Sequence, residues 1–209
     1  MRKPSLFFIA IVIAMLLMTN HYMNYSVGDS LFRFIGTSPW TEGDSTGMHL
    51  PVVLGLILIV VGIAGASKAY KPTYPKIVSR IIIGCILFSF LYPWATEKAA
   101  FIIKHNATGM DSFDYSKKDS SCTIRSDKPN NNQLTANCSF TIFNYGNESQ
   151  LTVRPIVSSE ADLQFEAKKI MIPSHTKVNV GAMFDGVQNR GTGFSGTVSN
   201  IELVIESVG

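Results

Sequence analysis

Cysteine is scarce in this chain, with three among 209 residues, and the common metal-binding motifs are absent. Neither the H-E-x-x-H pair of zinc proteases nor an acidic calcium-binding loop occurs. Residues 174–177, SHTK, match the S-x-x-K form of penicillin-binding serine enzymes, but the K-T-G element that those enzymes also require is missing. The sequence therefore lacks a catalytic constellation, and we expect neither enzyme activity nor a bound cofactor.

Charged residues are also absent from three long apolar segments. A helix that spans a bilayer needs about 20 mostly apolar residues. We therefore predict three transmembrane helices, near residues 5–22, 49–67 and 77–96, the last of which could extend to 104. Because paths for ions or protons place ionisable side chains within the bilayer, helices without charged residues apart from Arg80 at one end argue against transport by this chain alone.

The first apolar segment has a second interpretation. Arg2 and Lys3 followed by an apolar stretch are also typical of a signal peptide. The small residues of a cleavage site do not follow, since residues 17–21 read LMTNH. An uncleaved membrane anchor is the favoured interpretation, and cleavage would leave the topology of the remaining chain unchanged.

Basic residues predict the orientation of these helices. Arg2 and Lys3 precede the first helix, and the loop at residues 67–80 contains four basic and no acidic residues. The loop at residues 20–49 contains one basic and three acidic residues. Because positively charged loops stay in the cytoplasm, we predict a multi-pass plasma-membrane protein with a cytoplasmic N-terminus and an extracytoplasmic chain after Thr96.

Aromatic and small residues add detail to the membrane half. Trp40 and Trp94 are predicted interface anchors at the outer leaflet, where the amphipathic indole ring is favoured. Gly62 and Ala66 form a small-xxx-small pair, for which we predict contact with the first or third helix, with a homodimer contact as the alternative. Residues 30–40 are interpreted either as a short interfacial helix on the outer leaflet or as a lid on the outer domain.

The net charge of +3 is the sum of two unlike halves. Residues 1–105 contain nine basic and four acidic residues, a net of +5, whereas residues 106–209 contain nine and eleven, a net of −2. The basic excess lies beside apolar segments rather than over one face, so we expect no nucleic-acid partner. We accordingly divide the chain into a membrane anchor, residues 1–105, and an extracytoplasmic domain, residues 106–209.

The second half alternates apolar and polar residues with a period of two, which is typical of β-strands. Cys138, Phe140 and Ile142, for example, alternate with polar side chains. Six or seven such strands, separated by turn clusters, predict an antiparallel β-sandwich of the immunoglobulin-like (Ig-like) class. The fold class is thus membrane α plus all-β, with exposed tip loops expected at residues 126–133 and 185–193.

The spacing of two cysteines predicts how the first strands of this half pair. A hairpin centred on Asn130 would place Cys122 directly opposite Cys138, and Ile124 opposite Ala136. Opposed antiparallel residues have Cα atoms about 4.5–5.5 Å apart, which a disulfide can span. We predict a structural disulfide, since disulfides persist outside the cytoplasm, with two reduced thiols or a redox or metal role as alternatives.

Three histidines lie at the predicted outer ends of the helices, namely His21, His49 and His105. Imidazoles that meet at one membrane face could bind a transition metal. No H-x₃-H spacing supports such a site, and amphipathic side chains favour interfaces in any case. We therefore predict no metal site and keep these residues as candidates only.

Residues 138–157, CSFTIFNYGNESQLTVRPIV, resemble the early strands of Ig-like modules in small bacterial membrane proteins with an extracytoplasmic domain. The resemblance implies an adhesive or accessory role. We predict an integral membrane protein, in contact with lipid, whose sandwich binds or supports another membrane or envelope protein without catalysis, with sheet edges as docking surfaces. The alternatives are an accessory subunit of a transporter or channel assembly, a homo-oligomer, and a metal-handling or enzymatic role at the outer membrane face.

Overall fold

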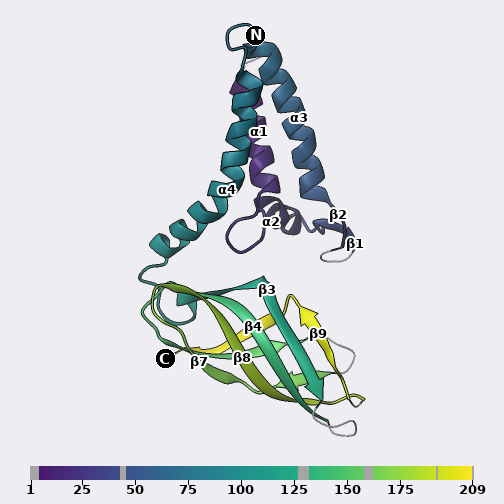
Figure 1. Cartoon of the computed structure of the whole chain (residues 1–209), viewed down its shortest axis with the longest axis vertical. Coiled ribbons are helices and arrows are strands. Elements are labelled where there is room, and N and C mark those ends of the chain that lie inside the picture. Colours follow the sequence, from purple (N-terminus) through teal and green to yellow (C-terminus); the bar gives the residue numbers. More distant parts are fainter. Residues whose placement is uncertain (1–4, 43–45, 127–131, 158–161, 192, 209) are drawn as a thin grey trace. The chain divides into compact units, whose positions relative to one another are not determined.

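The computed structural model describes residues 5–42, 46–126, 132–157, 162–191 and 193–208 of the chain (Figure 1). The chain divides into two compact units, Met1–Lys98 and Ala99–Gly209. We call the first the helical unit and the second the β unit.

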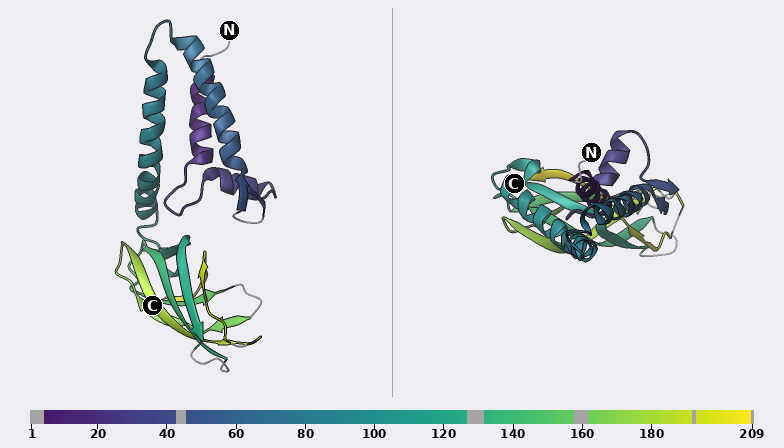
Figure 2. Two further views of the ribbon diagram at one scale, coloured as in Figure 1. Left: turned by 45° about the vertical axis from the view of Figure 1, so that its right-hand side comes forward. Right: turned by 90° about the horizontal axis from the view of Figure 1, so that it is seen from above.

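The helical unit consists mainly of apolar helices. Its described residues form α1 Ser5–Met18, α2 Val27–Phe34, β1 Trp40–Glu42, β2 Thr46–His49, α3 Leu50–Tyr70 and α4 Ile77–Ile103, the last of which continues into the β unit. α1 lies along α3, and α2 contacts both of these helices (Figure 2). Pro51 stands in the first turn of α3, where its missing N–H and fixed φ suit the start of a helix.

Within the described part of the chain, α3 and α4 are the two helices long and apolar enough to cross a membrane. At 1.5 Å per residue, α3 extends about 31 Å and α4 about 40 Å, against a hydrocarbon core of about 30 Å. α1 has 14 residues and extends only about 21 Å. It ends at Met18, short of the predicted residue 22, because the chain reverses and Asn20 pairs with Ser26. The structure therefore supports two helices of spanning length rather than the three predicted.

The small residues of α3 face α1. A Cβ atom on Gly62 would lie 2.6 Å from Cγ1 of Ile11, so only glycine allows this approach. Ala66 is fully buried in the same contact between the helices. The predicted small-residue pair, Gly62 and Ala66, thus packs on the first helix, and α1 occupies the surface that a homodimer contact through this pair would need.

The β unit contains two antiparallel sheets. Its described residues form a short 3₁₀ helix and eight strands, η1 Gly109–Ser112, β3 Phe113–Ser126, β4 Gln133–Asn144, β5 Gln150–Ile156, β6 Leu163–Phe165, β7 Lys168–Met171, β8 Thr176–Gln188, β9 Gly196–Ser199 and β10 Glu202–Val208. The larger sheet has the order β6-β8-β4-β3-β9 and the smaller has the order β10-β5-β7. The sheets form a sandwich-like arrangement (Figure 2), which confirms the antiparallel all-β class predicted for this half.

The core of the β unit consists of inward residues from both sheets. Successive side chains of a strand point to opposite faces, so every second residue of β4 is buried. The rings of Phe140 on β4 and Phe184 on β8 meet edge-on, with centroids 6.0 Å apart. Leu151 and Val153 of β5 and Leu203 of β10 belong to the same cluster. The alternation visible in the sequence is therefore the alternation between core and surface.

One predicted strand is divided in the structure, and one further strand was not predicted. Residues 162–173, expected as one strand, form β6 in the larger sheet and β7 in the smaller. Phe165 and Ile170 both join the core but stand five positions apart, an odd spacing that one regular strand cannot place on one face. The strand predicted at residues 199–208 forms β10 from Glu202 onward, whereas β9 was not predicted, and Asn200, with a φ of 58°, lies between the two. The described residues thus form eight strands where six or seven were predicted.

Candidate functional site

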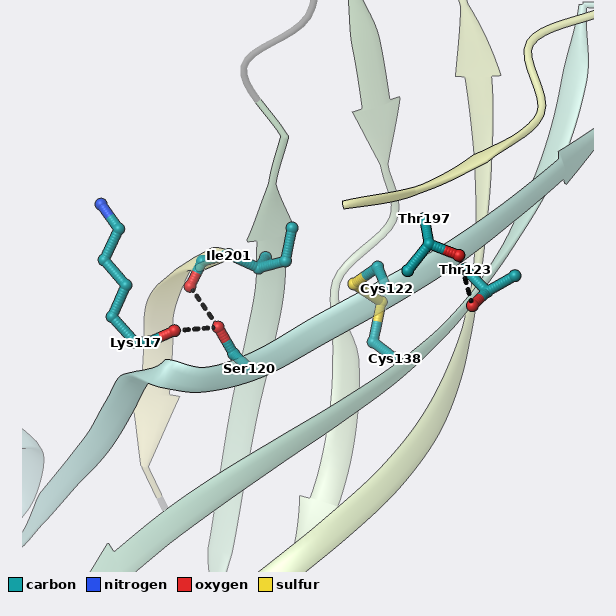
Figure 3. The surroundings of a disulfide bond; sticks show 7 residues. All are labelled: Lys117, Ser120, Cys122, Thr123, Cys138, Thr197 and Ile201. Carbon is teal, nitrogen blue, oxygen red and sulfur yellow. Dashed lines mark hydrogen bonds between the residues drawn. A yellow bond between two sulfur atoms is a disulfide. The ribbon is translucent and has the colours of Figure 1, made fainter. Parts of the chain in front are cut away.

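Cys122 and Cys138 form a disulfide within the larger sheet (Figure 3). β3 and β4 pair Cys122 with Cys138 and Ile124 with Ala136, which is the register predicted from the spacing. Asn130, the predicted centre of the hairpin, lies outside the described residues. Both cysteines are buried. Their bond joins two neighbouring strands of one sheet, whereas the disulfide of antibody domains joins the two sheets.

Hydroxyl groups fix the strands that flank the disulfide (Figure 3). The Ser120 hydroxyl lies within hydrogen-bond distance of the carbonyls of Lys117, at 2.6 Å, and Ile201, at 2.9 Å. The hydroxyl oxygens of Thr123 on β3 and Thr197 on β9 lie 3.3 Å apart. These contacts link β3 to the edge strand β9 and to the residue before β10. The residues around the disulfide therefore have a structural role.

His21 and His49, two of the three histidines considered as metal ligands, have partners within the helical unit. Nε2 of His49 lies 2.5 Å from Oδ1 of the buried Asp29. Nδ1 of His21 accepts a hydrogen bond from the amide of Met23 at 3.0 Å, and its ring lies against Tyr22. Among the described residues, no group of three or more histidine, cysteine, aspartate or glutamate side chains is arranged to hold a metal ion.

His105, the third candidate, lies in the β unit and stacks on His175 with ring centroids 4.2 Å apart. Nδ1 of His175 lies 2.6 Å from the Tyr145 carbonyl, and Nε2 lies 3.1 Å from Oδ1 of Asn147. His175 has a φ of 52°, a left-handed conformation that these contacts support. His175 therefore fastens the turn after β4 to the turn before β8, and His105, from the segment after α4, stacks on it.

A polar cluster fixes α2 at its N-terminus. Oγ of Ser26 accepts a hydrogen bond from the Asp29 amide at 2.9 Å, and Oδ2 of Asp29 accepts one from the Ser26 amide at 2.8 Å, which completes a capping box. Oδ1 of the same carboxylate contacts His49, whose ring lies 4.5 Å from that of Trp40. An Asp–His pair can orient an imidazole for catalysis. In this cluster the Ser26 hydroxyl accepts a hydrogen bond from the Asp29 backbone amide. The arrangement therefore positions the N-terminus of α2.

Asn144, fully buried at the end of β4, connects two turns of the β unit. Its Nδ2 lies within hydrogen-bond distance of the carbonyls of Glu148, Ile172 and Pro173, at 2.6, 3.3 and 3.0 Å. Its Oδ1 accepts a hydrogen bond from the Gly146 amide at 3.1 Å. A buried amide whose donor and acceptor are both hydrogen-bonded makes its surroundings more rigid. Asn144 therefore holds the two turns at this end of the sandwich in place.

Glu148 ties the same turn to η1. Its Oε1 accepts a hydrogen bond from the amide of Gly109 at 2.8 Å. This hydrogen bond, followed by donation from its own backbone amide, lowers the pKa of the Glu148 carboxyl below its ordinary value, and burial acts in the opposite direction. The carboxylate therefore serves as an acceptor for backbone amides, which stabilises the charged form.

An open groove of about 400 Å³ lies at the β6 edge of the larger sheet. It is lined by residues from the start of β4, from β6 and the position after it, and from the end of β8, namely Gln133, Leu134, Gln164, Phe165, Glu166, Asp185, Gly186 and Val187. Gly186 permits this shape, because a Cβ atom there would lie 2.5 Å from the Gln164 carbonyl. The groove combines two carboxylates with an exposed apolar side chain, Val187, a combination suited to binding a segment of another protein.

The loop predicted at residues 185–193 is shorter than expected. β8 continues through Gln188, because residues 185–187 pair with the start of β4. The buried Gln188 then organises the loop that follows, with Nε2 donating to the Arg190 carbonyl at 2.7 Å and Oε1 accepting from the Phe194 amide at 3.0 Å. Residues 127–131 of the other predicted tip loop, and residue 192, lie outside the described residues.

The outermost strands are short or charged, but β6 pairs only with residues 186–188 of β8, so among the described residues no strand pairs with residues 176–184 of β8 on the side away from β4. β6 has three residues and β7 and β9 have four each, and Lys168 and Lys169 occupy β7. β10 is longer, but its Glu206 pairs with Arg154 at 2.7 Å. Short edges and charged edges discourage pairing with another chain. The groove is therefore a docking candidate in addition to the edges that the sequence led us to expect.

The two predicted interface anchors differ in exposure. Trp94 is 61% exposed on α4, whereas Trp40 is half-buried and lies against His49. The indole of Trp94 is therefore the more available of the two to a membrane interface.

The chain matches no protein-family model, no curated protein and no solved structure. The candidate site residues are therefore identified from the geometry of the structure. Sequence reasoning missed Asp29, although the S-x-x-D spacing from Ser26 is a capping-box signal. It also missed Asn144 and the groove, for which no local signal exists because their partners come from distant strands.

Proposed function

We propose that this chain is a multi-pass protein of the plasma membrane that presents its β unit outside the cytoplasm, where the unit binds another membrane or envelope protein without catalysis. The observation that carries the proposal is the surface of α3 and α4. Both helices are apolar over the length of a bilayer, yet most of their large side chains are exposed, including Val60 and Phe90. Removing apolar surface from water is worth about 25 cal/mol per Å², so acyl chains are the expected surroundings.

Charge and the disulfide support the orientation. The turn between α3 and α4 contains Lys71 and Lys76 and no acidic residue, and such loops favour the cytoplasm. The disulfide between Cys122 and Cys138 favours an oxidising compartment. With the turn inside, α4 leads outward, so the β unit would lie on the side where its disulfide persists.

α1 belongs to this proposal as a third and short span. It packs along α3 through Gly62, and of its 14 residues all those after Ser5 are apolar. A span of about 21 Å is accommodated by local thinning of the bilayer and by long basic side chains that reach the interface. Arg2 and Lys3 stand at the end where such side chains are needed.

We assign partner binding to the groove beside β6. Glu166 and Asp185 favour a basic side chain, and the exposed Val187 favours an apolar one. The expected partner is thus an extracytoplasmic segment with both basic and apolar residues. The Ig-like class of the sandwich is part of the same proposal, since that class hosts many binding functions.

Cysteine labelling tests the orientation. In a Cys85→Ala background, Met183→Cys on β8 and Tyr74→Cys between α3 and α4 each introduce one exposed thiol. A membrane-impermeant maleimide should label position 183 on intact cells and position 74 only after permeabilisation. The reverse pattern would overturn the proposed topology.

Photo-crosslinking on intact cells tests the docking role. A photoreactive phenylalanine at Val187 should form an adduct with one protein, and Asp185→Lys should weaken that adduct because the charge in the groove is reversed. The same photoreactive residue at the exposed Lys118 on β3 is the matched control. Absence of an adduct at position 187, or equal adducts at both positions, would count against a role for the groove.

A further inference from the structure

α2 has three distinct faces. Successive residues of an α-helix are about 100° apart, so eight residues sample the whole circumference. Gly28 and Asp29 are buried on the face toward α1 and α3. Ser30 and Arg33 form an exposed polar face. The remaining face is apolar and exposed, and it consists of Val27, Leu31 and Phe34, extended by Ile35 directly after the helix.

The exposure of this apolar stripe is high for a folded chain. Phe34 is 87% exposed and Ile35 is 62% exposed. A contiguous apolar stripe on a helix normally faces a core, a partner or a membrane, because leaving it in water is unfavourable. The stripe therefore needs a cover from outside the helical unit.

Contacts with α1 and α3 fix the depth of α2. A Cβ atom on Gly28 would lie 2.6 Å from the Leu17 carbonyl and 2.6 Å from Cβ of Pro51, so the helix backbone touches both neighbours. Leu17 lies in the last turn of α1, and Pro51 lies in the first turn of α3. α2 is thus held at the level where both apolar helices end, which is the level of a bilayer interface.

The polar cluster at the start of α2 also fixes the direction of the stripe. Asp29 is 4% exposed and bonds the Ser26 amide with one oxygen and His49 with the other. Rotating the helix to bury Phe34 would break both contacts and leave a buried carboxylate without partners, which is costly. The outward direction of the stripe is therefore a stable property of the fold.

We propose that α2 is an interfacial helix that inserts Leu31, Phe34 and Ile35 among the acyl chains of the outer leaflet. This inference rests on the proposed membrane anchor, and it names phospholipid as the surface that covers the stripe. Arg33, on the adjoining polar face, makes no ion pair with any described residue and is placed to meet headgroup phosphates. α2 would thereby fix the height and tilt of the outer end of the helical unit.

Spin labelling of the full-length protein in vesicles of phosphatidylcholine and phosphatidylglycerol tests this inference. Labels are attached at Phe34→Cys and Ser30→Cys in a Cys85→Ala background that keeps the native disulfide. Both positions are exposed, so the substitutions remove no buried contact. Collisions with oxygen, which concentrates among acyl chains, are compared with collisions with a water-soluble nickel chelate. Val60→Cys, exposed in the middle of α3, reports separately on the anchor.

The oxygen-to-nickel collision ratio should be several-fold higher at position 34 than at position 30, and high at position 60. A nickel-accessible label at position 34 with an oxygen-accessible label at position 60 would overturn the role of α2 and leave the anchor standing. Protection of position 34 from both reagents would mean that protein covers the stripe, which also overturns the inference. A nickel-accessible label at position 60 would instead overturn the membrane anchor itself.

Discussion

The helical unit and the β unit bury apolar side chains to very different extents. Among the described residues, 18 buried side chains form one core in the β unit, whereas four form the core of the helical unit. The side chains of α3 and α4 stand mostly on the outside, while those of β4 alternate between the core and a polar face. Apolar composition therefore does not by itself define burial, because the expected surroundings differ, water for one unit and acyl chains for the other.

Removing one phenylalanine ring from each unit gives the largest test of this comparison. Phe140→Ala should lower the free energy of unfolding of the β unit by about 3–5 kcal/mol, because Phe140 is fully buried and its loss leaves a cavity. Phe90→Ala, on the exposed surface of α4, should change stability by less than about 0.5 kcal/mol. Urea denaturation of the full-length protein in detergent, followed by circular dichroism, measures both. Equal losses at the two positions would contradict the comparison.

Removing the disulfide should have the next largest effect. Cys122 and Cys138 are 16 positions apart, and opening a loop of this size costs about 3 kcal/mol through the entropy of the unfolded chain. The double variant Cys122→Ala/Cys138→Ala should therefore unfold at a lower urea concentration than the native protein under oxidising conditions. Cys85→Ala on α4 is the control and should leave the transition of the β unit unchanged. A native transition that does not respond to reductant would refute this prediction.

Adding a side chain at a helix glycine distinguishes closely packed surface from open surface within the helical unit. Gly62→Val should destabilise the contact between α1 and α3 by about 1–3 kcal/mol, because the new methyl groups meet Ile11. Gly84→Val on α4 is matched in chemistry, but a Cβ atom there has no neighbour within 4 Å, so it should have little effect. Hydrogen exchange of α1 amides in detergent distinguishes the two variants. Similar exchange rates in both would show that the contact is not close-packed.

The smallest expected effect concerns the pH dependence of the β unit. Hydrogen bonds from backbone amides, that of Gly109 first, lower the pKa of Glu148 in the folded state, so its folded pKa lies below its unfolded one. The resulting stabilisation is complete above the unfolded pKa and is lost as the pH falls through the folded pKa. Glu148→Gln should thus be slightly less stable than wild type at neutral pH, and the difference should vanish in strong acid.

Thermal unfolding at a series of pH values measures this difference. Glu166→Gln, which removes a carboxylate from the groove, controls for the change in net charge. A gap between Glu148→Gln and wild type that stays constant down to strong acid would contradict the assigned hydrogen bonds.

The sequence predicts those parts of the fold that depend on local periodicity. The alternation around Phe140 identifies a strand, and the spacing of Cys122 and Cys138 identifies its partner and register, because a disulfide restricts two strands to one alignment. Apolar length likewise identifies α3 and α4. These signals are contained within a few residues or a single pair.

Features that depend on distant contacts are not predictable in this way. The end of α1 at Met18 follows from the pairing of Asn20 with Ser26 rather than from loss of apolar residues. The contact of Asp29 with His49 joins positions 20 apart, with the rest of α2, β1 and most of β2 between them. The division between β6 and β7 follows from the position of a second sheet, although the odd spacing of Phe165 and Ile170 is a usable clue.

The disulfide between neighbouring strands also determines how the β unit would respond to force. β3 is the first strand after α4 along the chain, so tension arriving through α4 enters the sheet at Phe113. Such tension would separate β3 from β4 pair by pair until it reached Cys122, where the covalent bond transfers it to β4. β4 is the middle strand of five and pairs with β8 from Gln133 to Asn144. A pull along α4 would therefore detach the segment before Cys122 first, and the disulfide would hold the remainder of β3 on β4.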